Sequence, residues 1–412
     1  MKQSNKLSIK IINTTNIKDF AKAEAISYTS DSTDYYIKRL KMLADPKRAL
    51  ALADKDKIIG TANSFSEYIS LPKNKSSKVA AVSYVSVQPT HRRQGILSEM
   101  MKVQLNQIYS DYKEPLAILW PSETAIYGRF GYAPTREKHY KISKHNTQFT
   151  PGINDNPLEI KILNKKEAIN SYVEINNNLM NERPGVMKLT KEWAERRIED
   201  LSSKYLSTGP SYFVGIYDAN KLVGFVTYTI EGSNEYGNMP SSLNIWDIIY
   251  INDKAAINIW NYCLNIDLVD EINAKGVPED DVLESLLISP GSLNARITTS
   301  FWIRIVDVIK ALEARSYNEK GKLIFKLSDS IINQNNNTFF LDTKNQNSTC
   351  KISDESPDIE ITINGLSEIY LGTFNLNNLI ASQNLKIINK KIINFINRAF
   401  KENNSPFCPM HF

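Results

Sequence analysis

The spacing of apolar positions changes several times along the chain, and each change predicts an element of secondary structure. Small and β-branched residues fill positions 80–87, and Pro89 cannot donate a hydrogen bond to a sheet, so a strand should end near Gln88. Apolar residues then recur every three or four positions, which predicts a helix that begins at about Gly95 and has one apolar face. These positions are Leu97, Met100, Met101, Leu105, Ile108, Tyr109 and Tyr112.

The same spacing places further elements in the first part of the chain. We expect a helix over residues 17–28 and strands over residues 49–54, 58–68, 116–120 and 138–142. Strands that alternate with helices favour an α/β layered fold, in which ligands bind where a strand turns into a helix. We therefore take residues 1–155 as a first domain with its ligand at the turn before Gly95.

Two further domains are predicted, over residues 156–297 and 298–412. The middle one should have a helix over 166–180, strands over 212–216, 222–230 and 244–251, and a helix from Ala255. It has no counterpart of the basic turn before Gly95, so we expect no catalysis there. The last domain should open with a helix, whose apolar stripe would be Phe301, Trp302, Ile305, Val308, Ile309 and Leu312.

Strands should follow in the last domain, over residues 322–327 and 338–341 on either side of a polar turn at 333–337. Ile359, Ile361 and Ile363 alternate with polar residues, as in a half-buried strand. The apolar stripes of this domain are core in the simplest interpretation, and a lipid cavity is the alternative.

Composition narrows the class of protein. A chain of 412 residues with 42% hydrophobic content can form two or three domains, and its 50 basic residues are balanced by 45 acidic ones. Neither a nucleic-acid face nor a basic membrane-binding segment stands out, and no signal peptide or membrane-spanning run is visible, so we expect a cytoplasmic protein. The three cysteines are far apart and predict neither disulfides nor a metal site.

The turn before Gly95 has the chemistry of an anion site. Backbone N–H groups are free at a helix N-terminus, glycine allows close approach, and Arg92 and Arg93 add positive charge. Such a turn suits a pyrophosphate, although a basic turn that caps a surface helix remains the alternative. The segment lacks the Lys-Ser/Thr end of a P-loop and the three glycines of a dinucleotide loop, which argues against ATP and NAD.

Two segments resemble a known family. Arg92 and Gly95 fit the pyrophosphate pattern of GNAT N-acetyltransferases, Arg/Gln-x-x-Gly-x-Gly/Ala, and Leu97 departs from it. Residues 89–97 nevertheless resemble the Eis-like (enhanced intracellular survival) subfamily, in which leucine is usual there. Residues 122–132, Ser-Glu-Thr-Ala-Ile-Tyr-Gly-Arg-Phe-Gly-Tyr, are similar to that subfamily's second signature. Residues 181–185 and 301–308 also look like its landmarks, so the resemblance covers essentially the whole chain.

This resemblance implies an α+β fold with two GNAT-like domains, the second degenerate, and a sterol-carrier-like domain whose C-terminal tail enters the active site. It implies acetyl-CoA as cosubstrate without a metal, a hexamer or other higher assembly, and an amine acceptor, either an aminoglycoside or a protein or peptide lysine. Asp31, Asp34 and Glu67 are conceivable acidic lining groups. A different class, a lipid-binding protein that uses the last domain, remains open.

The resemblance also assigns roles to residues. Tyr127 would be the general acid, or it would only pack in the core. The α-carboxylate of Phe412 would be the general base, or the tail would only be docked for stability or disordered. A free α-carboxyl group has a pKa of about 3.3–3.7, which matches an ammonium group poorly, so desolvation or a water relay would have to help. Arg92 would bind the phosphoadenosine or merely solvate the turn. The other expected acetyl-CoA contacts are Val85, Ser86 and Val87 for the pantetheine arm, Arg93, Gln94, Gly95, Ile96, Leu97 and Ser98 for the pyrophosphate, and Ser122 and Glu123.

Overall fold

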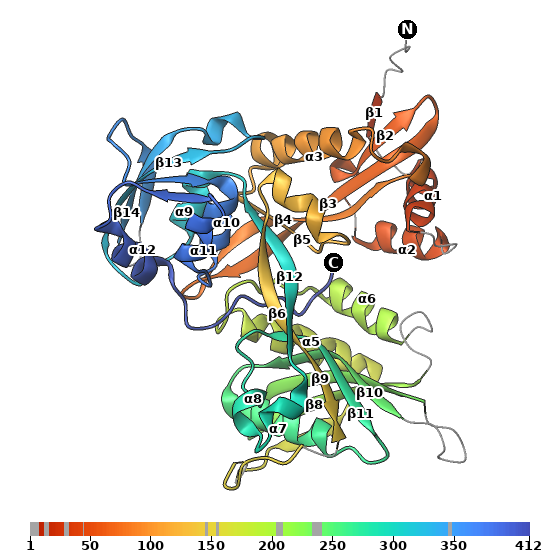
Figure 1. Cartoon of the computed structure of the whole chain (residues 1–412). Helices are drawn as coiled ribbons and strands as arrows, with labels where there is room; N and C mark the ends of the chain where they lie inside the picture. The colour runs from red at the N-terminus through yellow and green to blue at the C-terminus, as the bar shows by residue number, and fades with distance from the viewer. Residues whose placement is uncertain are drawn as a thin grey trace. The chain divides into compact units, whose positions relative to one another are not determined.

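The computed structural model describes residues 8–11, 16–28, 33–43, 45–144, 147–153, 156–202, 209–232, 241–344 and 348–412 (Figure 1). The chain divides into two compact units. The first contains residues 1–134, 301–401 and 412, and the second contains residues 135–300 and 402–411. The domain boundaries expected at 155/156 and 297/298 stay predictions.

One sheet of the first unit is built mostly from the N-terminal third of the chain. Its strand order is β1-β2-β3-β4-β5-β12. Only β4 and β5 are parallel among these pairs, and β12 runs antiparallel to β5. The strands are β1 (Ser8–Ile11), β2 (Leu50–Asp54), β3 (Lys57–Leu71), β4 (Lys75–Val87), β5 (Leu116–Leu119) and β12 (Arg296–Ile305). The predicted strands of this region are confirmed.

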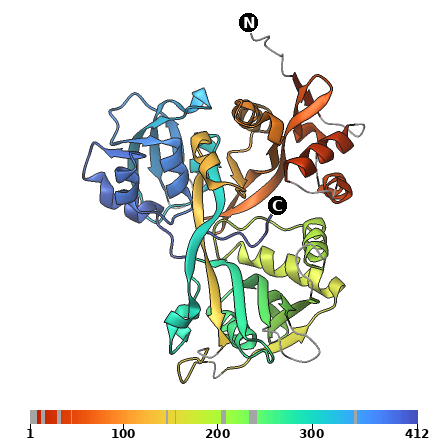
Figure 2. The same cartoon turned by 45° about the vertical axis from the view of Figure 1, so that its right-hand side comes forward.

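Helices cover both faces of this sheet, as Figures 1 and 2 show. Gly60 on β3 lies against α3, since a Cβ there would be 2.9 Å from Met100 Sδ. The next residue, Thr61, donates a hydrogen bond to Glu24 of α1. Successive residues of a strand point to opposite faces, so α1 and α3 lie on opposite sides of β3. The helices are α1 (Ile17–Ser27), α2 (Thr33–Leu43) and α3 (Ile96–Gln107), of which α2 was not predicted.

The helix expected to carry Phe301, Trp302 and Ile305 is wrong. These residues lie on strand β12, where Trp302 pairs with Leu119 of β5. Every residue from 300 to 305 is buried, so both faces of the strand are covered and the apolar run shows no alternation. The helix α9 (Val308–Ala314) begins only after Asp307, whose side chain accepts a hydrogen bond from the backbone N–H of Lys310.

A second sheet of the first unit comes from the C-terminal region, with strand order β15-β14-β13-β16-β17. The predicted strands at 322–327 and 338–341 are confirmed as an antiparallel pair. Ile359 and Ile361 lie on β16, but Ile363 begins helix α10. The elements are β13 (Gly321–Ser328), β14 (Thr338–Thr343), β15 (Thr349–Ile352), β16 (Ile359–Thr362), β17 (Leu385–Ile387), α10 (Ile363–Tyr370), α11 (Leu376–Ala381) and α12 (Ile392–Phe400).

The strands that belong mostly to the second unit follow one another in the order β6-β11-β10-β9-β8-β7. The predicted strands and the two predicted helices of this region are confirmed, whereas α6 was missed because its sequence is rich in charges. The strands are β6 (Ala133–Ser143), β7 (Glu159–Ile162), β8 (Ser211–Asp218), β9 (Lys221–Glu231), β10 (Ser242–Tyr250) and β11 (Glu271–Pro278). The helices are α5 (Lys165–Leu179), α6 (Lys191–Leu201), α7 (Asp253–Leu264) and α8 (Leu283–Leu286).

The described residues contain neither a membrane-spanning helix nor a metal-binding cluster. None of their helices combines the length and the apolar content needed to cross a bilayer. No cluster of three or more His, Cys, Asp or Glu side chains that could hold a metal occurs among them.

Candidate active site

The site begins where β4 separates from β5. The two strands pair only from Val79 to Val82 on β4, while β4 continues to Val87. At the separation β4 contains a bulge, since Thr61 pairs with Ser86 and Asn63 pairs with Ser83, which leaves one extra residue on β4. Tyr84 in this bulge has φ 53°, a left-handed conformation that costs energy for an aromatic residue. Residues 83–87 therefore form a splayed strand end.

The turn after β4 has the geometry of an anion site. Arg93 has φ 61° and Gly95 has φ 82°, and Gly95 is the N-cap of α3. Left-handed residues in a turn direct successive backbone N–H groups into one concavity. A Cβ placed on Gly95 would meet no atom within 4 Å, so an incoming group can approach the backbone there. Arg93 and Gln94 are exposed beside it.

Arg92 has a different environment from Arg93. Its Nε donates to the carbonyl oxygen of Val87 at 3.2 Å, and its Nη2 donates to the carbonyl oxygen of Ser27 at 2.9 Å. The guanidinium thus joins the end of β4 to the C-terminus of α1, where a helix dipole favours a cation. These bonds show Arg92 holding the turn, a role that was not predicted.

Tyr127 lies at the end of α4 (Thr124–Tyr127), directly after β5. Its side chain is 4% exposed, and its ring packs edge-on against that of Tyr132 with 6.1 Å between centroids. Burial raises the pKa of Tyr127, and the charges of Tyr28 and Glu24 raise it further. The phenol is therefore protonated and can donate a proton. Ser122 and Glu123, just before α4, are exposed.

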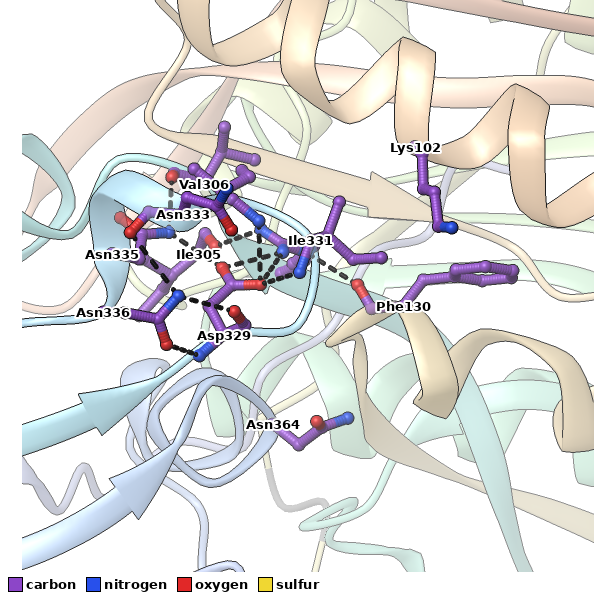
Figure 3. A network of polar contacts seen from close by, with 12 residues as sticks. Lys102, Phe130, Ile305, Val306, Asp329, Ile331, Asn333, Asn335, Asn336 and Asn364 are labelled. Carbon is purple, nitrogen blue, oxygen red and sulfur yellow. Dashed lines mark hydrogen bonds and ion pairs between the residues drawn. The ribbon is translucent and has the colours of Figure 1, made fainter.

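Side chains from later in the chain hold the turn that follows Tyr127 (Figure 3). Arg304 Nε donates to the carbonyl oxygen of Phe130 at 2.6 Å, and Arg304 Nη2 pairs with Asp329 at 2.8 Å. Asn364 Nδ2 donates to the carbonyl oxygens of Gly128 at 2.6 Å and Tyr132 at 3.1 Å. These supports were not predicted, because they belong to elements about 180 to 240 positions away in sequence.

Residues 405–410 and Phe412 are buried, as in a docked tail rather than a disordered one. Within the second unit, the Phe407 N–H donates to the carbonyl oxygen of Pro184 at 3.0 Å, and Arg196 Nη2 donates to that of His411 at 3.1 Å. Phe412 belongs to the first unit, where it is 8% exposed. Ser83 Oγ donates to the backbone oxygen of Phe412 at 3.3 Å.

Tyr127 and Phe412 line one cavity of about 190 Å³ beside the splayed end of β4. Glu24 of α1 and Arg39 of α2 also line it. Of the conceivable acids named above, Asp34 and Glu67 do not line this cavity, and Asp31 lies outside the described residues. Glu24 was missed because it occupies a buried position of a helix. The one available signal was a charged residue between the apolar positions of that helix.

Comparison with known families identifies the parts of the chain. An acetyltransferase (GNAT) domain model matches residues 8–135, and a second acetyltransferase (GNAT) domain model matches residues 185–305. A sterol carrier protein domain model matches residues 308–409.

Whole-chain relatives agree with this order of domains. An uncharacterized N-acetyltransferase of Streptomyces avermitilis is 28% identical over 90% of each chain. The N-acetyltransferase Eis of Mycobacterium tuberculosis is 24% identical over 83% of each chain. The chain belongs to the Eis-like GNAT N-acetyltransferases.

Solved structures show the same fold over nearly the full length of this Eis-like enzyme. The crystal structure of Eis1 from Mycobacterium abscessus superposes with a TM-score of 0.82 at 22% identity, covering 98% of this chain and 100% of the other. A GCN5-related N-acetyltransferase from Anabaena variabilis superposes with a TM-score of 0.83 at 19% identity, covering 99% and 100%. The predicted fold, two GNAT-like domains and a sterol-carrier-like domain, is confirmed.

Proposed function

We propose that this enzyme transfers the acetyl group of acetyl-CoA to a primary amine, with Tyr127 as general acid and the Phe412 α-carboxylate as general base. The observation that carries the proposal is that Tyr127 and Phe412, 285 positions apart, line one cavity at the splayed end of β4. A packing role alone would not require the last residue of the sequence to enter this cavity.

The residues of the strand end and the turn fit acetyl-CoA. The backbone of Val85, Ser86 and Val87 lies beyond the last β4–β5 pair, so it can bind an extended pantetheine arm. The concave turn from Arg93 through Gly95 suits a pyrophosphate, which would extend over Ile96, Leu97 and Ser98 at the start of α3. Ser122 and Glu123 are exposed and are proposed as further contacts on this side.

The chemistry uses these groups in sequence. The Phe412 carboxylate takes a proton from the acceptor nitrogen, because a protonated amine cannot attack a carbonyl. A backbone N–H of residues 85–87 donates to the oxyanion that forms. Tyr127 then gives its phenolic proton to the departing thiolate, a step for which a protonated, buried phenol is suited.

The acceptor is proposed to be cationic before it reacts. Carboxylates in a cavity favour polyamines of the aminoglycoside type or lysine side chains, because both carry ammonium groups. Glu24 and the Phe412 carboxylate would supply that negative charge, although Arg39 partly offsets it. A small-molecule amine therefore fits as well as a peptide lysine.

The hexamer that the resemblance implies stays a prediction.

A CoA-release assay tests the proposal. The acceptor panel contains a multi-amine aminoglycoside, a polyamine and a lysine peptide, and the enzymes are wild type, Tyr127→Phe and a variant extended by a few residues beyond Phe412. Both variants should bind acetyl-CoA and lose turnover about 10²- to 10⁴-fold. Tyr68→Phe, whose ring is 43% exposed on β3, is the matched control and should keep full activity.

Two results would contradict parts of this proposal. Unchanged activity in the extended variant removes Phe412 from the mechanism. Failure of the wild type both to bind acetyl-CoA and to release CoA with every amine removes the acetyl-transfer reaction itself.

Lipid binding by the C-terminal domain finds no supporting observation. A hollow of about 710 Å³ lies beside β16 and β17, but charged and amide side chains contribute much of its lining. They are Lys326, Glu360, Gln383, Asn384 and Lys386. The alternating apolar residues of β13 and β14 are buried as core instead.

A further inference from the structure

Glu24 is a buried carboxylate that the mechanism above leaves without a chemical task. It lies on the face of α1 that packs on the sheet, is 2% exposed, and lines the cavity with Tyr127 and Phe412. Thr61 Oγ1 donates to Glu24 Oε2 at 2.6 Å, and the same hydroxyl lies 2.7 Å from Ser86 Oγ. A chain of hydrogen-bonding groups thus runs from Glu24 to β4, where we place the pantetheine arm.

The surroundings of Glu24 favour a carboxylate that exchanges protons. Burial raises the pKa of Glu24, while hydrogen bonds from Thr61 and Ser86 and the charge of Arg39 act in the opposite direction. The charge of Glu24 in turn raises the pKa of Tyr127, so the two side chains interact. Among the described residues, the titratable and charged groups around Glu24 are Tyr28 just after α1, Tyr36 and Arg39 of α2, Tyr84 of β4, Tyr127 of α4 and the carboxylate of Phe412.

An ammonium acceptor must lose two protons before it becomes an amide. The first must leave before attack and comes from a strongly basic nitrogen, which a weakly basic α-carboxylate removes poorly. The second leaves after attack, when the nitrogen bears a positive charge next to the tetrahedral carbon and is far more acidic. Glu24 and the Phe412 carboxylate line one cavity and can divide these two steps between them.

We propose that Glu24 is the acceptor of the first proton and thereby prepares the amine for attack. This inference rests on the acetyl transfer proposed above and refines its proton steps: removal of the first proton, before attack, passes from the Phe412 carboxylate to Glu24, and Phe412 takes the second proton, after attack. In this scheme Glu24 binds the ammonium group and takes one proton, and the neutral nitrogen then attacks the thioester carbonyl carbon. Glu24 thus selects acceptors that arrive as cations.

The protons and bonds balance over one turnover. The new C–N bond forms with the nitrogen lone pair, and the Phe412 carboxylate takes the second proton. The C–S bond then breaks, and Tyr127 gives its proton to the thiolate. The protonated Phe412 carboxylate reprotonates Tyr127, and Glu24 releases its proton to water. The sum is one ammonium and one acetyl thioester converted to one amide, one thiol and one free proton.

Glu24→Gln tests this role, because glutamine keeps the size and can still accept the Thr61 hydrogen bond. The two acceptors are ethylamine and 2,2,2-trifluoroethylamine, which are similar in shape but differ in basicity, since the fluorinated ammonium is largely deprotonated at neutral pH. With ethylamine at pH 7, kcat/KM should fall about 10²- to 10⁴-fold. With trifluoroethylamine it should stay within about threefold of wild type, because no first proton needs removal.

The pH profile gives a second readout. Glu24 works only as an anion, so wild-type kcat/KM with ethylamine should fall as the pH drops through the Glu24 pKa, which burial raises. In Glu24→Gln, the rate should instead climb about tenfold per pH unit up to the pKa of the amine. Glu99→Gln, an exposed substitution on α3, is the control and should keep the wild-type profile. Acetyl-CoA affinity should be unchanged in every variant.

The outcomes separate the two proposals. Equal losses with both amines, or an unchanged rate with ethylamine, overturn the role of Glu24 while acetyl transfer stands. If Glu24→Gln does not fold, the wild type still decides. Its rate with ethylamine must reach a plateau well below the pKa of the amine, and a rate that climbs about tenfold per pH unit up to that pKa overturns the inference. A wild type inactive with these amines and with the aminoglycoside, polyamine and lysine-peptide panel overturns the acetyl transfer itself, and with it the role of Glu24.

Discussion

Replacing Arg304 by methionine should destabilise the first unit and misplace Tyr127. Arg304 and Asp329 are both 0% exposed, and Arg304 forms four hydrogen bonds: two with Asp329, one with the Phe130 carbonyl and one with the Ile305 carbonyl. Methionine fills a similar apolar volume but leaves the Asp329 carboxylate buried without its cation. Removing one partner of a buried ion pair costs about 3–5 kcal/mol.

This free energy translates into a measurable shift. The denaturant dependence of unfolding for a unit of this size is about 2–3 kcal/mol per molar urea, so the urea midpoint should fall by about 1–2 M. Activity should fall as well, because Phe130 is three residues beyond Tyr127 and loses the donor that fixes its carbonyl. A displacement of about 1 Å at the general acid can cost about 10²-fold in kcat.

A double-mutant cycle measures the pair itself. The variants are Arg304→Met, Asp329→Asn and the double substitution, followed by urea unfolding and by the CoA-release rate at saturating substrates. The double variant should be more stable than the sum of the two single losses implies, because it leaves no buried charge unpaired. Midpoint shifts below about 0.3 M in both single variants would show that the ion pair does not stabilise this region.

Three further predictions follow from local geometry. Gly131→Ala should lower both stability and kcat, because Gly131 has φ 84° and a Cβ there would lie 2.8 Å from Ile363 Cγ2. A variant with the melting temperature and the turnover of wild type would refute this. Gly95→Val should weaken acetyl-CoA binding at least about tenfold, as measured by calorimetry. A β-branched residue resists φ 82°, and its side chain would cover the backbone N–H groups of the turn. Unchanged affinity would remove the turn from the cofactor site. At pH 8, thiol reagents should label fewer than one cysteine per native molecule, because Cys263, Cys350 and Cys408 are buried and burial raises the pKa of each thiol. In urea, all three cysteines should be labelled. Fast labelling of the native protein would contradict their burial.

Local patterns predicted many, though not all, of the elements that bury one face. The helix after Gly95 has apolar residues at helical spacing, and the strand before it ends at a proline, so both boundaries were readable. Strand β12 was misread because neighbours cover both of its faces and erase the alternation. Helix α6 was missed for the opposite reason, since charged residues such as Arg196 and Arg197 are buried on it through ion pairs with Asp200 and Asp247.

The site was predictable to the extent that its residues lie in contiguous motifs. The turn at Arg93 and Gly95 and the position of Tyr127 after β5 could be read from two short segments. The place of Phe412 in the cavity came only from a resemblance to a family, because no local pattern brings a chain end to a distant strand. Glu24 was not found at all, since a single acid in an apolar helix face carries no sign of what it meets.

The dependence of the site on distant residues has a physical reason. The splayed end of β4 leaves backbone groups unpaired, and a bulge residue with a left-handed φ keeps it open, so the strand alone cannot fix the reacting groups. Hydrogen bonds from Arg304 and Asn364 hold the turn after Tyr127, and Ser83 holds Phe412. Each of these contacts joins segments far apart in sequence, so folding of the C-terminal region must precede assembly of the proposed acid and base. The first GNAT-like domain produced alone should therefore keep the turn for acetyl-CoA but lack the support and the carboxylate that the reaction requires.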